Sequence, residues 1–351
     1  MSRPIGYYVH HHGDGHRQRA LAITAEMRGR MVLLGTGLAG RTGGVPSIDL
    51  PDDRIAGGGF DGHDASAARP RSLHYAPIDH DGIRRRTARI AQWIAEARPA
   101  LIVVDVSVEV AMLARLASVP TVYVRLSGRR DDQPHAEAFR GASALLAPFH
   151  ALLDDDDTPA DMRRRTIYAP GLGVRPPAIR AEDDVVLAVI GRGGEKIDSR
   201  RWADAAAATP GSRWKVIGPC AVPAICPPNL EFCGWVADAA SQIARAGLVV
   251  GAAGDGLVGT VLAARRPFVC LPEDRPYGEQ RSKAARLSAL GAAVVAPSWP
   301  DPRDWPALLD RARALDPAAQ AGLDDPEGAV HAAARLCALA DGIDDRERLT
   351  A

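Results

Sequence analysis

Short, continuous apolar runs recur along this chain, and each is followed by a glycine-containing turn and a helix-like segment rich in Ala, Leu and Arg. Runs that are apolar at every position are typical of strands buried on both faces of a sheet. Their alternation with helices predicts right-handed βαβ units and a parallel sheet. The predicted strands cover residues 5–10, 32–35, 100–106 and 121–126 in the first half of the chain, and residues 185–190, 213–217, 248–251, 267–271 and 292–296 in the second.

A segment rich in Pro, Gly and charge interrupts this alternation. Residues 154–165 read DDDDTPADMRRR and residues 169–177 read APGLGVRPP, which favours a linker over a helix or a strand. A chain of 351 residues has room for about two domains. We therefore predict a Rossmann-like domain over residues 1–170, a linker over residues 171–182, a second Rossmann-like domain over residues 183–335, and a terminal helix or tail over residues 336–351. Ligands of open α/β sheets bind in crevices at the carboxyl ends of strands, so a site shared by both halves is expected.

Charge and cysteine content narrow the class of protein. The 43 basic residues equal the 43 acidic ones, which argues against a nucleic-acid partner. The first residues contain no apolar signal-peptide core, and the most apolar later stretch, residues 247–264, includes a charged Asp. None of the five Cys belongs to a C-x-x-C pair, so free thiols in a reducing compartment are expected. The sequence predicts a cytoplasmic protein without a transmembrane segment, and contact with a membrane surface stays open.

The first predicted strand leads into a glycine loop, HHGDGHRQRALAI, over residues 11–23. Gly13 and Gly15 predict a tight turn into a helix whose free backbone N–H groups attract an anion or developing negative charge. The spacing differs from G-x-G-x-x-G, which argues against dinucleotide binding. His16 near the helix start is a candidate proton acceptor, with capping or packing as the alternative. The three His at 10–12 indicate a solvated strand end rather than a metal site, because adjacent side chains of an extended segment point to opposite faces.

A second glycine loop follows the first strand of the second half. It contains Gly191, Gly193 and Gly194 and precedes a helix-like segment. Such a loop suits phosphate oxygens bound to backbone N–H groups, with Arg192 or Lys196 offsetting their charge. The P-loop pattern is missing, so a nucleoside triphosphatase is not expected. A plain structural turn is the alternative.

A third region carries two polar loops, each directly after a predicted strand. The first loop contains Gly254, Asp255 and Gly256 and opens a helix, and the second covers residues 273–280. Carboxylates and amides from two such loops form hydrogen bonds to hydroxyl-rich ligands such as sugars and ribose. The polar residues concerned are Asp255, Glu273, Asp274, Arg275, Glu279 and Gln280.

Residues 230–297 and 10–23 resemble the glycosyltransferases of family 28, a group that includes the peptidoglycan N-acetylglucosaminyltransferase that makes lipid II. The matching motifs are Ala253-Gly254, Leu262 to Pro267, Glu279-Gln280 with Lys283 to Leu287, Gly15-His16, and Gly234-Trp235-Val236. The resemblance implies the GT-B fold, in which two Rossmann-like, doubly wound parallel-sheet domains face a cleft. It also implies that the second domain holds a UDP-sugar.

The same resemblance implies roles for individual residues. Gly193 and Gly194 would lie against the diphosphate, Gly254 to Gly256 would meet the phosphate and ribose, and Glu279 and Gln280 would bind sugar hydroxyls. The nucleotide base would lie against the backbone of Gly234, Trp235 and Val236. His16 would lie near the reacting carbon or the acceptor hydroxyl. The implied reaction is an inverting, metal-independent transfer from the UDP-sugar to an acceptor hydroxyl, without a cofactor.

Several positions depart from the family pattern and keep alternatives open. Thr260 stands where the family often has a ribose-binding Glu, Glu279 replaces the first Gln of a pair, and Lys283 replaces an Asn. A nucleotide-sugar 2-epimerase of the same fold and an inactive nucleotide-sugar-binding subunit are therefore alternatives. Asp105, at the end of a strand, either assists His16 as general base or caps the next helix, and we favour capping. The acidic run at residues 154–157 is predicted to be solvated linker rather than a D-x-D metal site.

Overall fold

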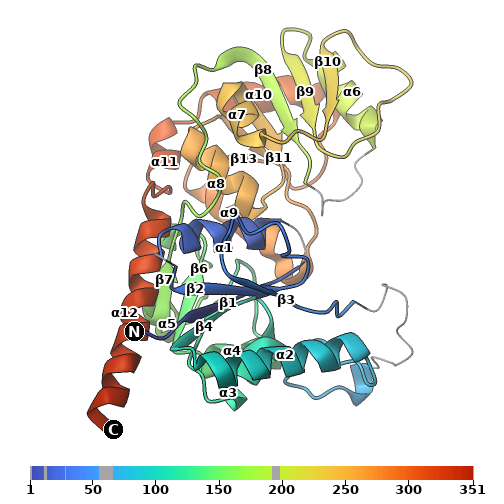
Figure 1. Ribbon diagram of the computed structural model, residues 1–351. Coiled ribbons are helices and arrows are strands. Elements are labelled where there is room, and N and C mark those ends of the chain that lie inside the picture. The colour runs from blue at the N-terminus through green and yellow to red at the C-terminus, as the bar shows by residue number, and fades with distance from the viewer. Residues whose placement is uncertain (1, 12–13, 28, 55–65, 192–197, 351) are drawn as a thin grey trace.

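The structure, a computed structural model, describes residues 2–11, 14–27, 29–54, 66–191 and 198–350. The chain forms two α/β domains placed one above the other (Figure 1). One sheet has seven strands and the other has six, and every neighbouring pair of strands is parallel. The predicted class, two doubly wound parallel sheets, is confirmed.

The first sheet has the strand order β3-β2-β1-β4-β5-β6-β7. Its strands are β1 (Ile5–Val9), β2 (Met31–Gly35), β3 (Ser47–Asp49), β4 (Leu101–Asp105), β5 (Thr121–Val124), β6 (Ala144–Ala147) and β7 (Thr166–Tyr168). The helices of this half are α1 (Gly15–Ala25), α2 (Asp81–Ala97), α3 (Val108–Leu116), α4 (Gln133–Gly141) and α5 (Ala160–Arg165).

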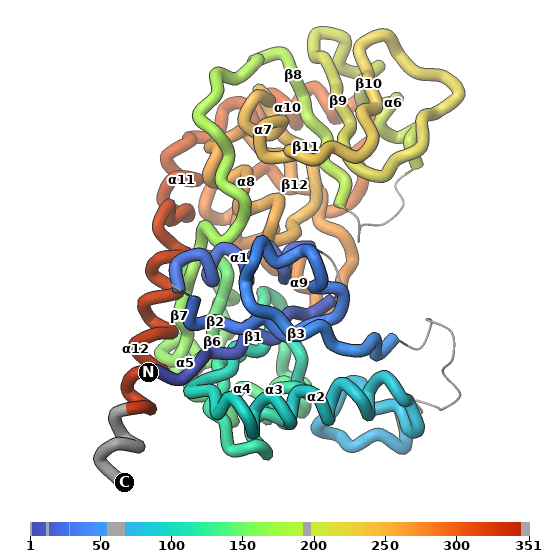
Figure 2. Tube along the Cα trace, viewed as in Figure 1, coloured from blue at the N-terminus to red at the C-terminus, as the bar shows by residue number. Residues whose placement is uncertain are grey.

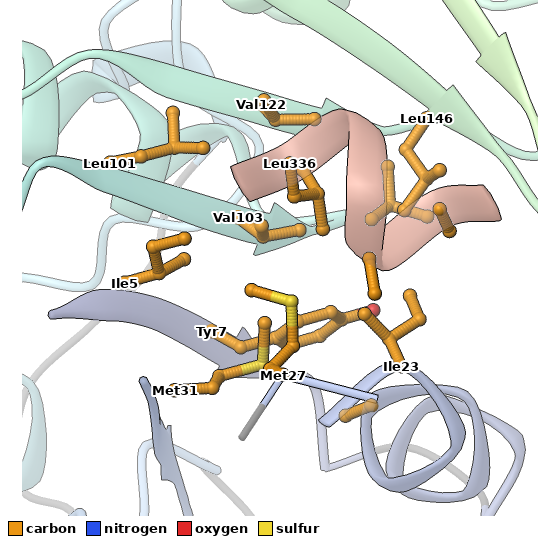
Figure 3. Close-up of a cluster of buried hydrophobic side chains, with 14 of the residues drawn as sticks. Ile5, Tyr7, Ile23, Met27, Met31, Leu101, Val103, Val122, Leu146 and Leu336 are labelled. Atoms are coloured by element: carbon orange, nitrogen blue, oxygen red, sulfur yellow. The ribbon is translucent and has the colours of Figure 1, made fainter. Parts of the chain in front are cut away.

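Both faces of the first sheet are buried, as continuous apolar strands require. Successive side chains of a strand point to opposite faces. Tyr7 therefore packs in one core, which includes residues of α1, and Tyr8 packs in the other, which includes residues of α2, α3 and α4. Figure 3 shows the first of these cores, where Tyr7 and Val103 lie near Ile23 of α1 and Leu336 of the last helix.

The second sheet has the strand order β10-β9-β8-β11-β12-β13. Its strands are β8 (Glu182–Val189), β9 (Arg213–Ile217), β10 (Leu230–Gly234), β11 (Ala246–Gly251), β12 (Phe268–Cys270) and β13 (Val294–Val295). The helices that follow β8 are α6 (Ser199–Ala208), α7 (Ala239–Arg245), α8 (Asp255–Ala264), α9 (Glu279–Ala289), α10 (Trp305–Arg313), α11 (Pro317–Ala321) and α12 (Gly328–Thr350).

The last helix, α12, leaves the second domain and lies along the first (Figure 1). Leu336 and Ala340 of this helix are fully buried in the core of the first sheet. Two ion pairs hold the same helix, because Arg30 contacts both Asp341 (2.5 Å) and Asp344 (3.1 Å). The end of the chain therefore completes the core of the first domain.

The prediction of a linker over residues 154–165 is wrong. Asp154 is buried, and it forms an ion pair with the buried Arg125 and accepts a hydrogen bond from the Tyr168 hydroxyl. Helix α5 and strand β7 follow directly and belong to the first domain. An acidic run has the same composition whether it is solvated or paired, so only the buried partner Arg125 identifies this segment as part of the fold.

Both sheets change the direction of their strand order at one point. The change lies between β1 and β4 in the first sheet and between β8 and β11 in the second. Ligands of doubly wound sheets bind in the crevice outside the carboxyl ends of strands at such a point. Helix α1, which follows β1, lies on the side of the first sheet that faces the second domain (Figure 2). The fold thus brings the loops after β1, β4, β8 and β11 toward one cleft.

Candidate functional site

His16 and Asp105 meet at the point where the strand order of the first sheet reverses. Strand β1 ends at Val9, and His16 lies in the first turn of α1, while Asp105 is the last residue of the neighbouring strand β4. The Nδ1 atom of His16 is 3.0 Å from Oδ1 of Asp105. The side chain of His16 is 15% exposed, whereas that of Asp105 is fully buried. The two residues thus form a histidine–carboxylate pair in which the histidine keeps a small exposed fraction.

Asp105 does not cap the following helix, so that prediction is wrong. Ser107 is the N-cap of α3, and its hydroxyl accepts a hydrogen bond from Val110 N at 3.3 Å. Val106, between Asp105 and Ser107, has a φ of 53°. This left-handed conformation is strained for a β-branched residue. It separates the strand end from the helix start and leaves the Asp105 carboxylate free to point toward α1.

Arg19 is the third member of this cluster. Its guanidinium group donates to both carboxylate oxygens of Asp105, at 3.0 to 3.2 Å, and its Nη2 atom is also 3.0 Å from His16 Nδ1. The Tyr7 hydroxyl donates to Asp105 Oδ2 at 3.2 Å. Arg19 lies three residues after His16 on the same helix, so the i,i+3 spacing was the available sequence signal. Arg19 was not among the predicted site residues.

The charge of Asp105 is stabilised despite complete burial. Burial raises the pKa of this carboxyl, but Arg19 and His16 lower it further than burial raises it, so that the net pKa lies far below its ordinary value. The Tyr7 hydroxyl, which faces the same carboxylate, has a pKa raised by burial and by Asp105. Asp105 is therefore an ionised partner for His16 across the physiological pH range and is itself too weak a base to accept a proton.

On the opposite side of the cleft, the loop after β11 opens helix α8. Gly254 is the N-cap, and Asp255 is the first helical residue. Asp255 forms an ion pair with the buried Lys283 of α9. Burial raises the pKa of Asp255, but Lys283 and, from the first domain, Arg19 lower it more, so the net pKa is below its ordinary value. Arg19 of the first domain and Asp255 of the second line the same cavity between the domains.

A cavity of 460 Å³ lies between the domains. The first domain contributes Gly15, Gln18 and Arg19, and the segment between the domains contributes Gly171 to Val174. The second domain supplies most of the lining, including Ile217 to Gly218, Trp235 to Ala240 and Gly254 to Leu257. This volume is within the range of small-molecule sites. The positive end of α8 opens into the cavity beside the largely apolar segment 235–240.

Most described residues that were predicted to bind substrate do line this cavity. Those that line it are Gly15, Gly191, Trp235, Val236, Gly254, Asp255, Gly256, Thr260, Arg275 and Gln280. His16, Gly234 and Glu279 are not among its lining residues. Gly13, Arg192, Gly193 and Gly194 lie outside the described residues. Thr260 is buried in α8, and its hydroxyl donates to Gly256 O at 2.9 Å, so it does not reproduce a ribose-binding carboxylate.

Gln280 connects the two polar loops of the second domain. Its Oε1 atom accepts hydrogen bonds from Ala253 N at 3.1 Å and from Glu273 N at 2.9 Å. The side chain is nearly buried at 6% exposure. Sequence reasoning assigned Gln280 to sugar hydroxyls only, whereas the structure adds a role in holding both loops in position.

We expect Gln280→Ala to lower the free energy of unfolding by about 2–4 kcal/mol, because two backbone N–H groups lose their acceptor at roughly 1–3 kcal/mol each. Gln280→Glu, which keeps an acceptor oxygen at this position, should lose clearly less. Urea unfolding followed by circular dichroism measures both changes. Equal losses for Ala and Glu would contradict the loop-holding role.

Two further groups of His and Asp, which the sequence analysis did not predict, occur in the first domain. They are His74 with Asp132 and His135, and His11 with Asp52 and Asp53. His11 is half-buried, with Nδ1 3.5 Å from Asp53 Oδ1, and His10 stacks on it, so the prediction of a solvated strand end is wrong for these two residues. Residue 12 lies outside the described residues.

The first of these groups has the geometry of a hydrogen-bonded network. Asp132 oxygens lie 2.7 Å from His74 Nε2 and 2.7 Å from His135 Nδ1. Tetrahedral zinc keeps N and O ligand atoms about 3.3 Å apart, given metal–ligand distances of about 2.0–2.1 Å. The observed separations are those of hydrogen bonds. Burial lowers the pKa of His135 to about 4, so that imidazole is neutral at physiological pH.

No protein-family model and no curated protein sequence matches the chain. Solved structures match it over almost their full length. The glycotransferase of kitacinnamycin aligns with a TM-score of 0.66 at 15% identity, over 99% of each chain. MurG from Acinetobacter baumannii aligns with a TM-score of 0.63 at 15% identity, over 95% of this chain and 98% of its own. UGT89C1 from Arabidopsis thaliana, complexed with UDP-L-rhamnose, aligns with a TM-score of 0.64 at 14% identity, over 89% of this chain and 92% of its own.

Among the described residues, no helix is both long and apolar enough to cross a membrane.

The compared structures are glycosyltransferases by name or GT-B proteins by fold, and MurG is family 28-like. The predicted resemblance to family 28 is therefore confirmed as a likeness of fold. Together with the two parallel sheets and the cavity between them, these likenesses show that the chain has the GT-B fold, two Rossmann-like domains that face each other across a cleft.

Proposed function

We propose that this protein is an inverting glycosyltransferase that moves a sugar from a nucleotide sugar to an acceptor hydroxyl. The observation that carries the proposal is the His16–Asp105 pair, which lies at the carboxyl ends of two strands next to the cavity between the domains. The likeness to glycosyltransferases over nearly the whole chain supports the reaction class. A UDP-sugar is the proposed donor, in keeping with the UDP-L-rhamnose of the UGT89C1 complex.

In the proposed mechanism, His16 is the general base. His16 Nδ1 lies 3.0 Å from both Asp105 Oδ1 and Arg19 Nη2, and we assign the proton of the neutral ring to Nδ1, on the side of the Asp105 carboxylate. In this tautomer the lone pair of Nε2 accepts the proton of the acceptor hydroxyl. The acceptor oxygen forms a bond to the anomeric carbon while the bond from that carbon to the diphosphate oxygen breaks. One displacement of this kind inverts the anomeric centre. Asp105 keeps its negative charge and stabilises the imidazolium that forms, as a carboxylate does beside a catalytic histidine.

The second domain would hold the donor. The N-terminus of α8 offers backbone N–H groups and a positive helix end to the diphosphate. The Asp255 carboxylate next to them is paired with Lys283, which reduces its repulsion of an incoming diphosphate. Trp235 and Val236 supply an apolar surface for the nucleotide base of the donor. Because the helix end and backbone groups stabilise the leaving diphosphate, the scheme requires no metal ion.

Thermal unfolding in the presence of nucleotides tests the donor half of the proposal. A ligand that binds only the folded state stabilises it by about 2.7 kcal/mol at a hundredfold excess over its dissociation constant. We expect UDP to raise the unfolding midpoint by several degrees, and one UDP-sugar to raise it further. Thymidine, adenosine and guanosine diphosphates, and free uridine, are the matched comparisons.

Each outcome of this experiment assigns or removes a donor. A shift with another nucleotide series would replace UDP in the proposal. Incubation of the protein with the UDP-sugar that binds separates the alternatives: isomerisation of this sugar without an acceptor would indicate a 2-epimerase, and binding without turnover toward any acceptor would indicate an inactive binding subunit. The absence of a shift with every nucleotide and nucleotide sugar would contradict the glycosyltransferase proposal.

A further inference from the structure

We propose that Arg130 of the first domain is a positioning residue for the donor sugar, which it acts on through Glu279 of the second domain. This inference rests on the proposed function and deepens it, because it states how the first domain takes part in the recognition of the donor sugar. Arg130 Nη2 is 2.9 Å from Glu279 Oε2. The side chain of Arg130 is 7% exposed and that of Glu279 is 30% exposed.

Arg130, like His16 and Asp105, lies at the carboxyl ends of the strands of the first sheet. It belongs to the loop between β5, which ends at Val124 and pairs with β4, and α4, which begins at Gln133. Glu279 opens α9 and precedes Gln280, which lines the cavity between the domains. The ion pair therefore joins the strand ends that carry the proposed general base, His16, to the loop that faces the proposed donor.

Tyr277, two residues before Glu279, strengthens this contact. The Arg130 guanidinium carbon lies 4.6 Å from the centre of the Tyr277 ring, a cation–π geometry. The same ring meets that of His135 edge-on at a centroid distance of 4.9 Å, and its hydroxyl is 3.3 Å from His74 Nε2. Tyr277, which stays partly exposed, thus packs against a socket on the first domain formed by Arg130, His74 and His135. Asp132 binds both histidines and holds the socket in shape.

The backbone on both sides is shaped for this approach. Tyr277 and Gly278 both have a φ of 63°. Gly128 has a φ of 93°, and a Cβ atom there would lie 2.5 Å from Tyr277 O and 2.8 Å from the Glu279 Cα. Arg129 N donates to Tyr277 O at 3.0 Å. A positive φ at a tyrosine is uncommon and persists where surrounding contacts determine it. The contact between the domains is therefore built into both loops.

The consequence concerns the orientation of the Glu279 carboxylate. Arg130 engages Oε2, while Oε1 has no hydrogen-bond partner within the part of the chain that the structure describes. Fixing one oxygen aligns the other for a sugar hydroxyl and removes the entropy that a free glutamate side chain would lose on binding. Arg130 Nε is buried and also has no hydrogen-bond partner among the described residues.

Calorimetric titration of the full chain tests this role without requiring turnover. We expect Arg130→Met to weaken binding of the best UDP-sugar by about tenfold, with the affinity for UDP alone changed less than twofold. Glu279→Gln should have a similar effect, and the double variant should be no worse than either single one, because Arg130 acts through Glu279. Arg130→Lys, which keeps the charge, should recover part of the loss.

Arg281→Met is the matched control, because Arg281 lies next to Gln280 and is 61% exposed, and its only ion pair among the described residues is with the exposed Asp274, at 3.6 Å. It should leave both affinities unchanged. Additive losses in the double variant, or equal losses for UDP and UDP-sugar, would overturn the inference, as would unchanged or tighter UDP-sugar binding in Arg130→Met. If that variant does not fold, Arg130→Lys and Glu279→Gln carry the same cycle. Failure of the wild-type protein to bind any nucleotide sugar would instead contradict the proposed function.

Discussion

His16→Ala is expected to lower turnover by about a hundredfold or more while the affinity for the nucleoside diphosphate stays unchanged. General base catalysis contributes on the order of 10² to 10⁴ in rate, and the variant loses the atom that accepts the acceptor proton. The diphosphate would bind at the start of α8 on the other domain, so its affinity does not depend on the imidazole. Initial rates of UDP release with a working acceptor, and calorimetric titration with UDP, measure the two quantities.

His331→Ala is a suitable control, because His331 is 59% exposed on α12 and, within the described part of the chain, forms ion pairs only with the nearby Asp325 and Glu327. It should leave turnover unchanged. Added imidazole should restore part of the activity of His16→Ala, since a small base can enter the space left by the side chain. Wild-type turnover in His16→Ala would remove this residue from the role of base.

The second large effect is expected for Asp105→Asn, which should reduce both turnover and stability. An amide holds the His16 tautomer less well and does not stabilise the imidazolium, so turnover should fall by roughly a hundredfold or more. The buried Arg19 would at the same time lose its counter-ion. Breaking a buried ion pair by removing one partner costs about 3–5 kcal/mol, and this is the expected loss in the free energy of unfolding.

The stability loss of Asp105→Asn should depend on pH with a defined sign. Burial raises the pKa of Asp105, but Arg19 and His16 lower it more. The net pKa in the folded protein is therefore lower than the unfolded value of about 3.9. The stabilisation from the ionised carboxylate is thus fully present above about pH 5 and is lost as the pH falls below the unfolded pKa toward the folded one.

Urea unfolding at pH 7, 5 and 3 measures this effect, and the difference between wild type and Asp105→Asn should narrow at pH 3. Asp310→Asn is the control, because Asp310 is 78% exposed and its only ion pair in the part of the chain that the structure describes is with Arg313, at 3.4 Å. Its effect should be small at every pH. A constant difference between wild type and Asp105→Asn from pH 7 to pH 3 would contradict the assigned charge state of Asp105.

Strands were predictable where their apolar run was long and buried on both faces. The strands at β1, β4, β8 and β11, which form the centres of the two sheets, were all predicted within a few residues of their observed ends. The strands that were not predicted are β3, β6, β7 and β10. Three of them lie at sheet edges, where exposed positions interrupt the apolar run, as in β3 (Ser47–Asp49). Their pairing depends on a neighbouring strand rather than on their own composition.

The candidate site was predictable to the extent that it follows from strand ends. His16 and the loop from Gly254 to Gly256 come directly after predicted strands, and parallel strands bring such loops to one edge. The direction of the Asp105 side chain was not predictable, because a carboxylate at a strand end has the same sequence context whether it caps a helix or pairs with Arg19. Three-dimensional packing of α1 against β4 decided between the two.

The sequence by itself determined the α/β class, the two domains and the glycine loops, because these follow from local periodicity and from residues that allow tight turns. Only the tertiary structure decided which charges are paired. Arg130 and Glu279 are 149 residues apart in the sequence. Arg125, which follows β5, forms an ion pair with Asp154, which lies between β6 and β7. No local pattern contains such a pairing, because it depends on how distant segments pack, between the two domains for Arg130 and Glu279 and within the first domain for Arg125 and Asp154. The same packing decides which side chains of the cleft act on one another.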